Sequence, residues 1–145
     1  MISFSVPGTP APQGSKTYLG NGRMVESSKR VKPWRADIRA AALANFKQPF
    51  TGPIRLDLAF VMPRPKSHYG TGRNVNKIKP SAPVLHTQKP DLDKLIRAVG
   101  DALTGVAYHD DSQVVGGSHI KRWTYGVGDR PGVHIAVVPL EEKEK

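Results

Sequence analysis

Large apolar residues alternate with polar or small ones in several stretches of the chain, and this period of two predicts β-strands. The clearest case is IRLDLAFVM, residues 54–62, in which Ile54 and every second residue after it share one face. Glycines at 116 and 117 interrupt a later stretch, which predicts a strand pair or one strand bent at a bulge. The other predicted strands span residues 2–6, 113–125 and 133–140.

Two further stretches repeat apolar residues at helical spacing. Residues 34–46 (WRADIRAAALANF), which follow Pro33, predict a first helix. Residues 91–103 gather their apolar side chains on one arc of a helical wheel and their charged side chains on the opposite arc. This pattern predicts a strongly amphipathic second helix that begins at Asp91 and stops before Gly105.

The order of the predicted elements favours an α+β fold, in which a mixed β-sheet carries two main helices. A length of 145 residues predicts one domain, residues 1–140, followed by a charged tail, residues 141–145. The Pro- and Gly-rich residues 7–23 predict a loop. The glycine and lysine spacing in that loop does not match a phosphate-binding P-loop, so a nucleotide cofactor is excluded.

A long segment without a predicted element, residues 63–90, contains five prolines, six basic residues and no acidic residue. Loops of this length in compact domains are usually functional or disordered. We expect a mobile basic arm that becomes ordered on DNA, although a solvated linker is the alternative. Its basic residues are Arg64, Lys66, Arg73, Lys77, Lys79 and Lys89.

The net charge is +10, and it is distributed unevenly. Residues 1–89 hold 15 basic and 3 acidic residues, whereas residues 90–145 hold 7 basic and 9 acidic residues. A basic surface of this size usually binds a polyanion, most commonly nucleic acid, but the charge alone does not separate a binding protein from an enzyme. Four basic residues near the N-terminus are further candidates for phosphate contacts: Lys16, Arg23, Lys29 and Arg30.

Cysteine is absent, which excludes disulfides and thiolate metal sites and favours a reducing cytoplasm. No run of 18 apolar residues predicts a membrane span, and the N-terminal residues do not resemble a signal peptide. The sequence therefore indicates a cytoplasmic protein with no membrane partner.

Five of the twelve acidic residues lie in one stretch, residues 89–115. Each has an ordinary structural explanation. Asp91 and Asp93 would cap the second helix or interact with its dipole, and Asp101 would pair with Arg97 on the helix surface. Asp110 and Asp111 would shape a turn; they are the last two acids of the stretch.

The alternative explanation is a metal site. Asp91 and Asp93 at the start of a helix can direct both carboxylates to one space, and the turn after the helix can return Asp110 or Asp111 to it. Carboxylates crowded together repel one another unless a cation lies among them. Oxygen-only ligands favour Mg²⁺, with Mn²⁺ as a possible substitute, and such a metal on a basic surface suits phosphodiester hydrolysis.

The sequence KPDLDKLIRAVGDAL, residues 89–103, followed by HDDSQVV, residues 109–115, resembles the RusA family of Holliday-junction resolvases of bacteria and phages. The resemblance implies a homodimeric, Mg²⁺-dependent endonuclease that nicks opposed strands of a four-way DNA junction during recombination and repair. It also implies that Asp91, Asp93 and Asp111 hold the metal.

The family has a catalytic lysine one helical turn after the second aspartate, and Arg97 stands at that position here. Arginine keeps the positive charge but does not deprotonate in proteins. Lys94 would partly replace the missing proton donor. The competing hypotheses are a non-catalytic nucleic-acid-binding protein, in which the acids only cap and turn the chain, and a related nuclease that cuts other branched DNA.

Overall fold

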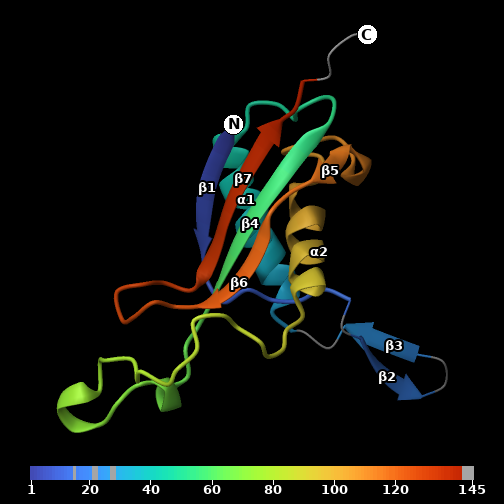
Figure 1. The fold of residues 1–145 in the computed structure, drawn as a ribbon. Coiled ribbons are helices and arrows are strands. Elements are labelled where there is room, and N and C mark those ends of the chain that lie inside the picture. The colour runs from blue at the N-terminus through green and yellow to red at the C-terminus, as the bar shows by residue number, and fades with distance from the viewer. Residues whose placement is uncertain (15, 21–22, 27–28, 142–145) are drawn as a thin grey trace.

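The computed structural model describes residues 1–14, 16–20, 23–26 and 29–141, and gives no side chains between residues 15 and 28. Five strands form a mixed sheet, and two helices cover one face of it (Figure 1). The predicted α+β class is thereby confirmed. The sheet strands are β1 (Ile2–Pro7), β4 (Ile54–Met62), β5 (Val114–Gly116), β6 (His119–Trp123) and β7 (Gly132–Pro139), and the helices are α1 (Val31–Asn45) and α2 (Leu92–Leu103).

The sheet is antiparallel on one side of β4 and parallel on the other. β7 lies between β1 and β4 and is antiparallel to both, whereas β5 and β6 run parallel to β4 along its other edge. The alternation predicted for β4 is confirmed, because Ile54, Leu56, Leu58 and Phe60 are all buried against the helices. The core therefore lies between the two helices and one face of the sheet.

Helix α1 begins at Val31, which is earlier than the predicted start after Pro33. Proline is tolerated in the first turn, where its missing N–H group would have no helical partner, so Pro33 does not stop the helix. Trp34 and Ile38 from the predicted apolar stripe are buried in the core.

Helix α2 matches the predicted span closely, and its apolar face is buried. Leu95, Val99 and Leu103 are fully buried, while Asp93 and Arg97 on the opposite arc are exposed. The helix ends at Leu103, and Gly105 just beyond it has φ +85° and donates its N–H to the carbonyl of Tyr108 at 2.7 Å. Within the described residues, neither helix is long and apolar enough to cross a membrane.

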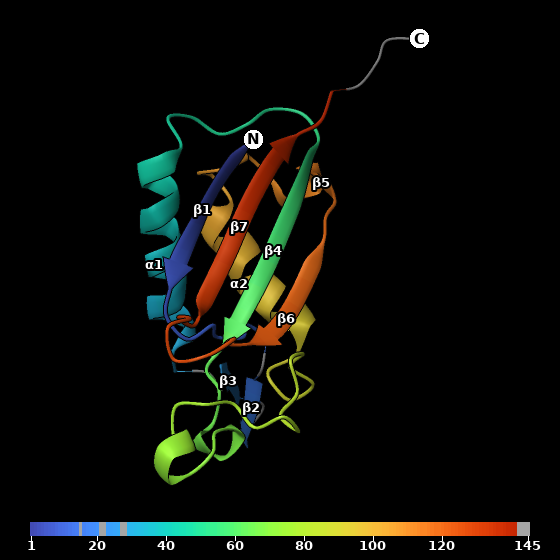
Figure 2. The same ribbon diagram turned by 60° about the vertical axis from the view of Figure 1, so that its left-hand side comes forward.

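Part of the predicted N-terminal loop is a hairpin instead. Strand β2 (Lys16–Gly20) pairs antiparallel with β3 (Arg23–Glu26). Thr17, Tyr18 and Val25 favour strands, and this preference outweighs the local content of glycine. The hairpin lies at the end of the molecule where α2 begins (Figures 1 and 2).

The basic segment 63–90 leaves the sheet at the same end, and most of it extends beyond the sheet (Figures 1 and 2). Two 3₁₀ turns, Lys66–His68 and Gly72–Asn74, give it local structure. Its base is closed by Arg64, whose guanidinium donates to the carbonyls of Thr124 at 2.9 Å and Pro83 at 2.8 Å. Residues 84–86 return to β6, where the N–H of Trp123 donates to the carbonyl of Val84 at 2.9 Å and the N–H of His86 donates to that of Lys121 at 3.2 Å. The ordering of this arm on DNA stays a prediction.

The predicted interruption at glycine lies between β5 and β6. These two strands pair one after the other with the same edge of β4. A Cβ atom built on Gly117 would lie 1.8 Å from the carbonyl oxygen of Leu56, whereas one on Gly116 meets nothing within 4 Å. The backbones of Gly117 and β4 therefore approach more closely than any side chain allows.

We expect Gly117→Ala to lower the free energy of unfolding by about 2–4 kcal/mol, because β4 and the edge strands must separate to admit the methyl group. Gly116→Ala is the matched control and should change it by less than about 1 kcal/mol. Urea unfolding followed by circular dichroism measures both values. Equal stabilities of the two variants would show that the close approach is unimportant.

Candidate active site

The two carboxylates at the start of α2 are not used to cap it. Asp91 occupies the N-cap position, but its side chain makes no capping hydrogen bond. The side chain is 52% exposed, and its Oδ2 lies 3.8 Å from Nζ of Lys94. Asp93 follows in the first turn and is exposed as well. The capping role considered for Asp91 is therefore wrong, and both carboxylates are open to an external cation.

The backbone just before Asp91 is held by a lysine from the sheet. The Lys121 ammonium donates to the carbonyl oxygens of Gln88 at 2.6 Å and Pro90 at 2.7 Å. Burial lowers the pKa of this ammonium group, and the nearby carboxylate of Asp91 opposes the shift. Lys121 thus links the middle of β6 to the start of α2.

The sequence analysis missed Lys121, although one signal was present. In β6, Lys121 pairs in register with Phe60, which is buried on the helix-facing side of β4. The period of two therefore places this lysine on the inner face of its strand, beside buried Trp123. A lysine on an inner face needs polar partners, and here the carbonyl groups ahead of α2 supply them.

The two basic residues predicted for the site differ in their surroundings. Lys94 is half-buried, and its carbonyl oxygen accepts a hydrogen bond from the N–H of Gln13 at 3.0 Å. Arg97 is exposed, and its Nη1 lies 2.8 Å from the position that a Cβ on Gly14 would take. The loop after β1 therefore runs along the polar face of α2, with Lys94 on the side of Asp91.

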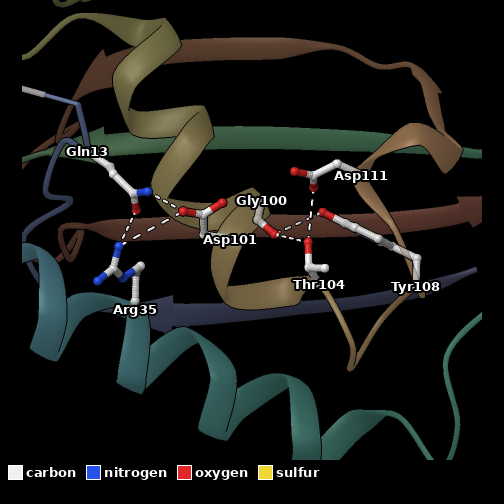
Figure 3. A network of polar contacts seen from close by, with 7 residues as sticks. All are labelled: Gln13, Arg35, Gly100, Asp101, Thr104, Tyr108 and Asp111. Carbon is white, nitrogen blue, oxygen red and sulfur yellow. Dashed lines mark hydrogen bonds and ion pairs between the residues drawn. The ribbon is translucent and has the colours of Figure 1, made fainter.

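Asp101 has partners other than the one predicted. Gln13 donates its side-chain amide to the carboxylate of Asp101, and Arg35 of α1 lies 4.0 Å from the same carboxylate (Figure 3). Among the ion pairs of the described residues, the partner of Asp101 is thus Arg35 and not Arg97. The spacing within α2 could not reveal this pair, because α1 brings Arg35 across from another part of the chain.

Asp110 and Asp111 have different roles. Asp110 caps the 3₁₀ turn Asp111–Gln113 by accepting from the N–H of Ser112 at 2.9 Å, and these backbone and hydroxyl donors lower its pKa. The turn-forming role is therefore confirmed for Asp110. Asp111 instead accepts from the hydroxyl of Thr104 at 3.0 Å (Figure 3).

Asp111 lies beside the last turns of α2. Its Oδ1 is 3.6 Å from the position that a Cβ on Gly100 would take, and burial together with this carboxylate raises the pKa of Tyr108. Gly100 follows Asp93 by seven residues, so the two positions share a helix face and are separated by about 10 Å along the axis. The single chain therefore places Asp91 and Asp93 at the start of α2 and Asp111 about two turns away.

Within the described part of the chain, no group of three acidic or histidine side chains is close enough to hold a metal ion. The convergence of Asp91, Asp93 and Asp111 on one ion accordingly stays a prediction. Two of its three members belong to the start of α2, which is the end of the helix nearest to the basic arm (Figure 1).

Most of the predicted phosphate-binding residues are exposed near this end of the molecule. Arg64 is the exception, because its guanidinium is half-buried and engaged in closing the arm. The side chains of Lys16 and Arg23, on the hairpin, lie outside the description. The exposed residues are Lys29, Arg30, Lys66, Arg73, Lys77, Lys79 and Lys89.

We expect Lys121→Met to loosen the start of α2, because it removes both hydrogen bonds to the preceding backbone. Amide hydrogen exchange at Leu95, whose N–H bonds to the carbonyl of Asp91, should become about 5- to 30-fold faster. Lys66→Met, at an exposed position in the arm, is the control and should leave that rate unchanged. Identical exchange in the two variants would contradict the role of Lys121.

The chain is similar in sequence to known proteins. The uncharacterized protein YqaN of Bacillus subtilis (strain 168) is 32% identical over 119 residues, which cover 79% of this chain and 82% of that protein. The family model of endodeoxyribonuclease RusA matches residues 7–138, which include both helices, strands β4, β5 and β6, nearly all of β7 and every candidate acidic residue. The chain therefore belongs to the RusA family of endodeoxyribonucleases.

Proposed function

We propose that the protein is a Mg²⁺-dependent, structure-selective endonuclease that resolves four-way DNA junctions by paired, symmetric nicks. The family supplies the class of reaction. The observation that carries the proposal is the pair Asp91 and Asp93, exposed at a helix start and free of any capping hydrogen bond. An acidic pair in that position, on a chain of net charge +10, suits a cation that binds DNA phosphate.

The metal would be held by Asp91 and Asp93, with Asp111 as the third ligand. Carboxylate oxygens alone suit Mg²⁺ and admit Mn²⁺. When bound, such an ion activates water and neutralises charge at the scissile phosphate. The carboxylates of Asp91 and Asp93 keep the site negative enough to retain the cation on a basic surface.

Asp111 takes part in this proposal by a movement of its turn. Its carboxylate accepts a hydrogen bond from the Thr104 hydroxyl and also interacts with the hydroxyl of Tyr108. A divalent ion held by Asp91 and Asp93 would attract this carboxylate, and the short turn of residues 109–113 would have to carry it along the face of α2.

The basic residues would hold the phosphate backbone and stabilise developing negative charge. Arg97 supplies a permanent positive charge one turn after Asp93. Lys94, which already lies beside Asp91, is the residue that can also give up a proton. The exposed arginines and lysines of the arm and of residues 29–30 would contact the DNA arms, so affinity should fall with salt.

Two nicks on opposed strands require two active sites, and a homodimer supplies them with the two-fold symmetry of the junction. The absence of cysteine fits a cytoplasmic enzyme. A non-catalytic DNA-binding protein is the second candidate, because the three proposed ligands do not meet within the described single chain.

The test is cleavage of a synthetic four-way junction with Mg²⁺, with Mn²⁺ and with a chelator. Asp91→Asn, Asp93→Asn and Asp111→Asn should each lower the rate at least about 100-fold without weakening junction binding, because only the metal site is lost. Asp37→Asn, which removes an exposed acid from α1, is the matched control and should cut normally.

Each alternative outcome of this experiment supports a different function for the protein. Absence of cleavage under every metal condition favours the binding protein, and equal cleavage of flaps or linear duplexes favours a nuclease for other branched DNA. Full activity of Asp111→Asn would remove this residue from the metal site and leave the first two.

A further inference from the structure

We propose that the cleft beside Asp91 is a pocket for one unpaired nucleotide of the DNA substrate, with the base inside and its phosphate at the rim. This inference rests on the proposed function, because it describes how the same site selects its substrate. The cleft has a volume of about 700 Å³. This is within the range of about 300–1,000 Å³ that small-molecule sites occupy.

The walls of the cleft are flat and apolar. Five proline rings line it: two from the loop after β1, two from the start of the basic arm and one just before Asp91. Met62, His86 and Trp123 lie among them, and the last two rings pack at a centroid distance of 4.2 Å. A planar aromatic group fits between such surfaces without losing hydrogen bonds to the walls, as bases do in pockets that hold unstacked nucleotides.

The rim of the cleft is strongly basic. Lys29, Arg30, Lys89 and Lys94 line it, and Asp91 is its only acidic residue among those described. An occupant that is apolar alone would gain nothing from four cations, and a simple anion would gain nothing from the proline walls. A nucleotide combines both properties, because its base is planar and its phosphate is negatively charged.

Two residues that line the cleft carry buried ring nitrogens without a partner in the described chain. Nδ1 of His86 and Nε1 of Trp123 have no hydrogen-bond partner within the described chain, and these side chains are only 6% and 4% exposed. Burial, together with the charge of Lys121, lowers the pKa of His86 and thus favours its neutral imidazole. A neutral imidazole and an indole N–H are the kinds of group that bond to the edges of bases.

The position of the cleft gives this pocket a function. Asp91 and Lys94 belong both to its lining and to the proposed metal site. A nucleotide with its base in the cleft would therefore have its phosphate beside the metal ligands. Fully paired duplex DNA offers no free base, whereas the branch point of a junction does so at a smaller cost in base pairing. The pocket would thus restrict cleavage to branched DNA.

The experiment measures binding of four-way junctions in which single nucleotides near the branch point are replaced, one at a time, by abasic residues. Binding is measured with Asp93→Asn protein and without divalent metal, so that cleavage does not contribute. At one position, loss of the base should weaken binding about 5- to 100-fold, which corresponds to the stacking of one base.

Two proline variants locate that effect. Pro65→Glu places a carboxylate in the wall of the cleft, and Pro80→Glu places one at an exposed proline of the same arm that does not line the cleft. The abasic penalty should shrink to less than 2-fold in Pro65→Glu and persist in Pro80→Glu. No abasic penalty at any position, or an equal penalty in the two variants, would overturn the pocket.

This result is independent of the proposed nuclease activity. Cleavage of the intact junction by the unmodified protein decides whether the protein is a nuclease, while the abasic series decides only where a base is held. A protein that cuts junctions but shows no abasic penalty would retain its proposed function and lose the pocket.

Discussion

The ammonium group of Lys121, held beneath the carbonyls of Gln88 and Pro90, joins the sheet to the start of α2. This connection fixes the backbone that leads into Asp91, and it brings a positive charge near the carboxylate of Asp91 without a direct hydrogen bond to it. A partly buried lysine needs such acceptors, so the fold and the start of the site share one set of contacts.

The remainder of the site follows from the way α2 packs. Its apolar face is fully engaged with α1 and the sheet, so the helix cannot rotate and its polar face is presented outward. Asp91 at the N-cap and Asp93 in the first turn are both exposed there. The basic arm and the hairpin extend from the same end of the molecule (Figure 2).

Asp111 is the proposed metal ligand that lies apart from the other two in the single chain. The turn after α2 places Asp111 beside Gly100, on the same face of the helix as Asp93 but about two helical turns away from it. The hydroxyl groups of Thr104 and Tyr108 lie at that end of the helix, where both interact with the carboxylate of Asp111.

The sequence by itself determined the features that depend on near neighbours. The alternation in β4, the span and apolar face of α2, the stop at Gly105 and the interruption at Gly117 all follow from spacing, because each involves residues a few positions apart. Pro33 and the β2–β3 hairpin misled the prediction, since local propensity there admits more than one outcome.

Only the tertiary structure decided which distant residues meet. The partners of Asp101, the role of Lys121, the place of Asp111 and the cleft itself join residues that are far apart in the chain. Such contacts depend on how α1, α2 and the sheet pack against one another. The spacing of apolar residues along the sequence does not specify that packing. The acidic motif is therefore visible in the sequence, whereas the geometry that makes it a candidate site is a property of the folded chain.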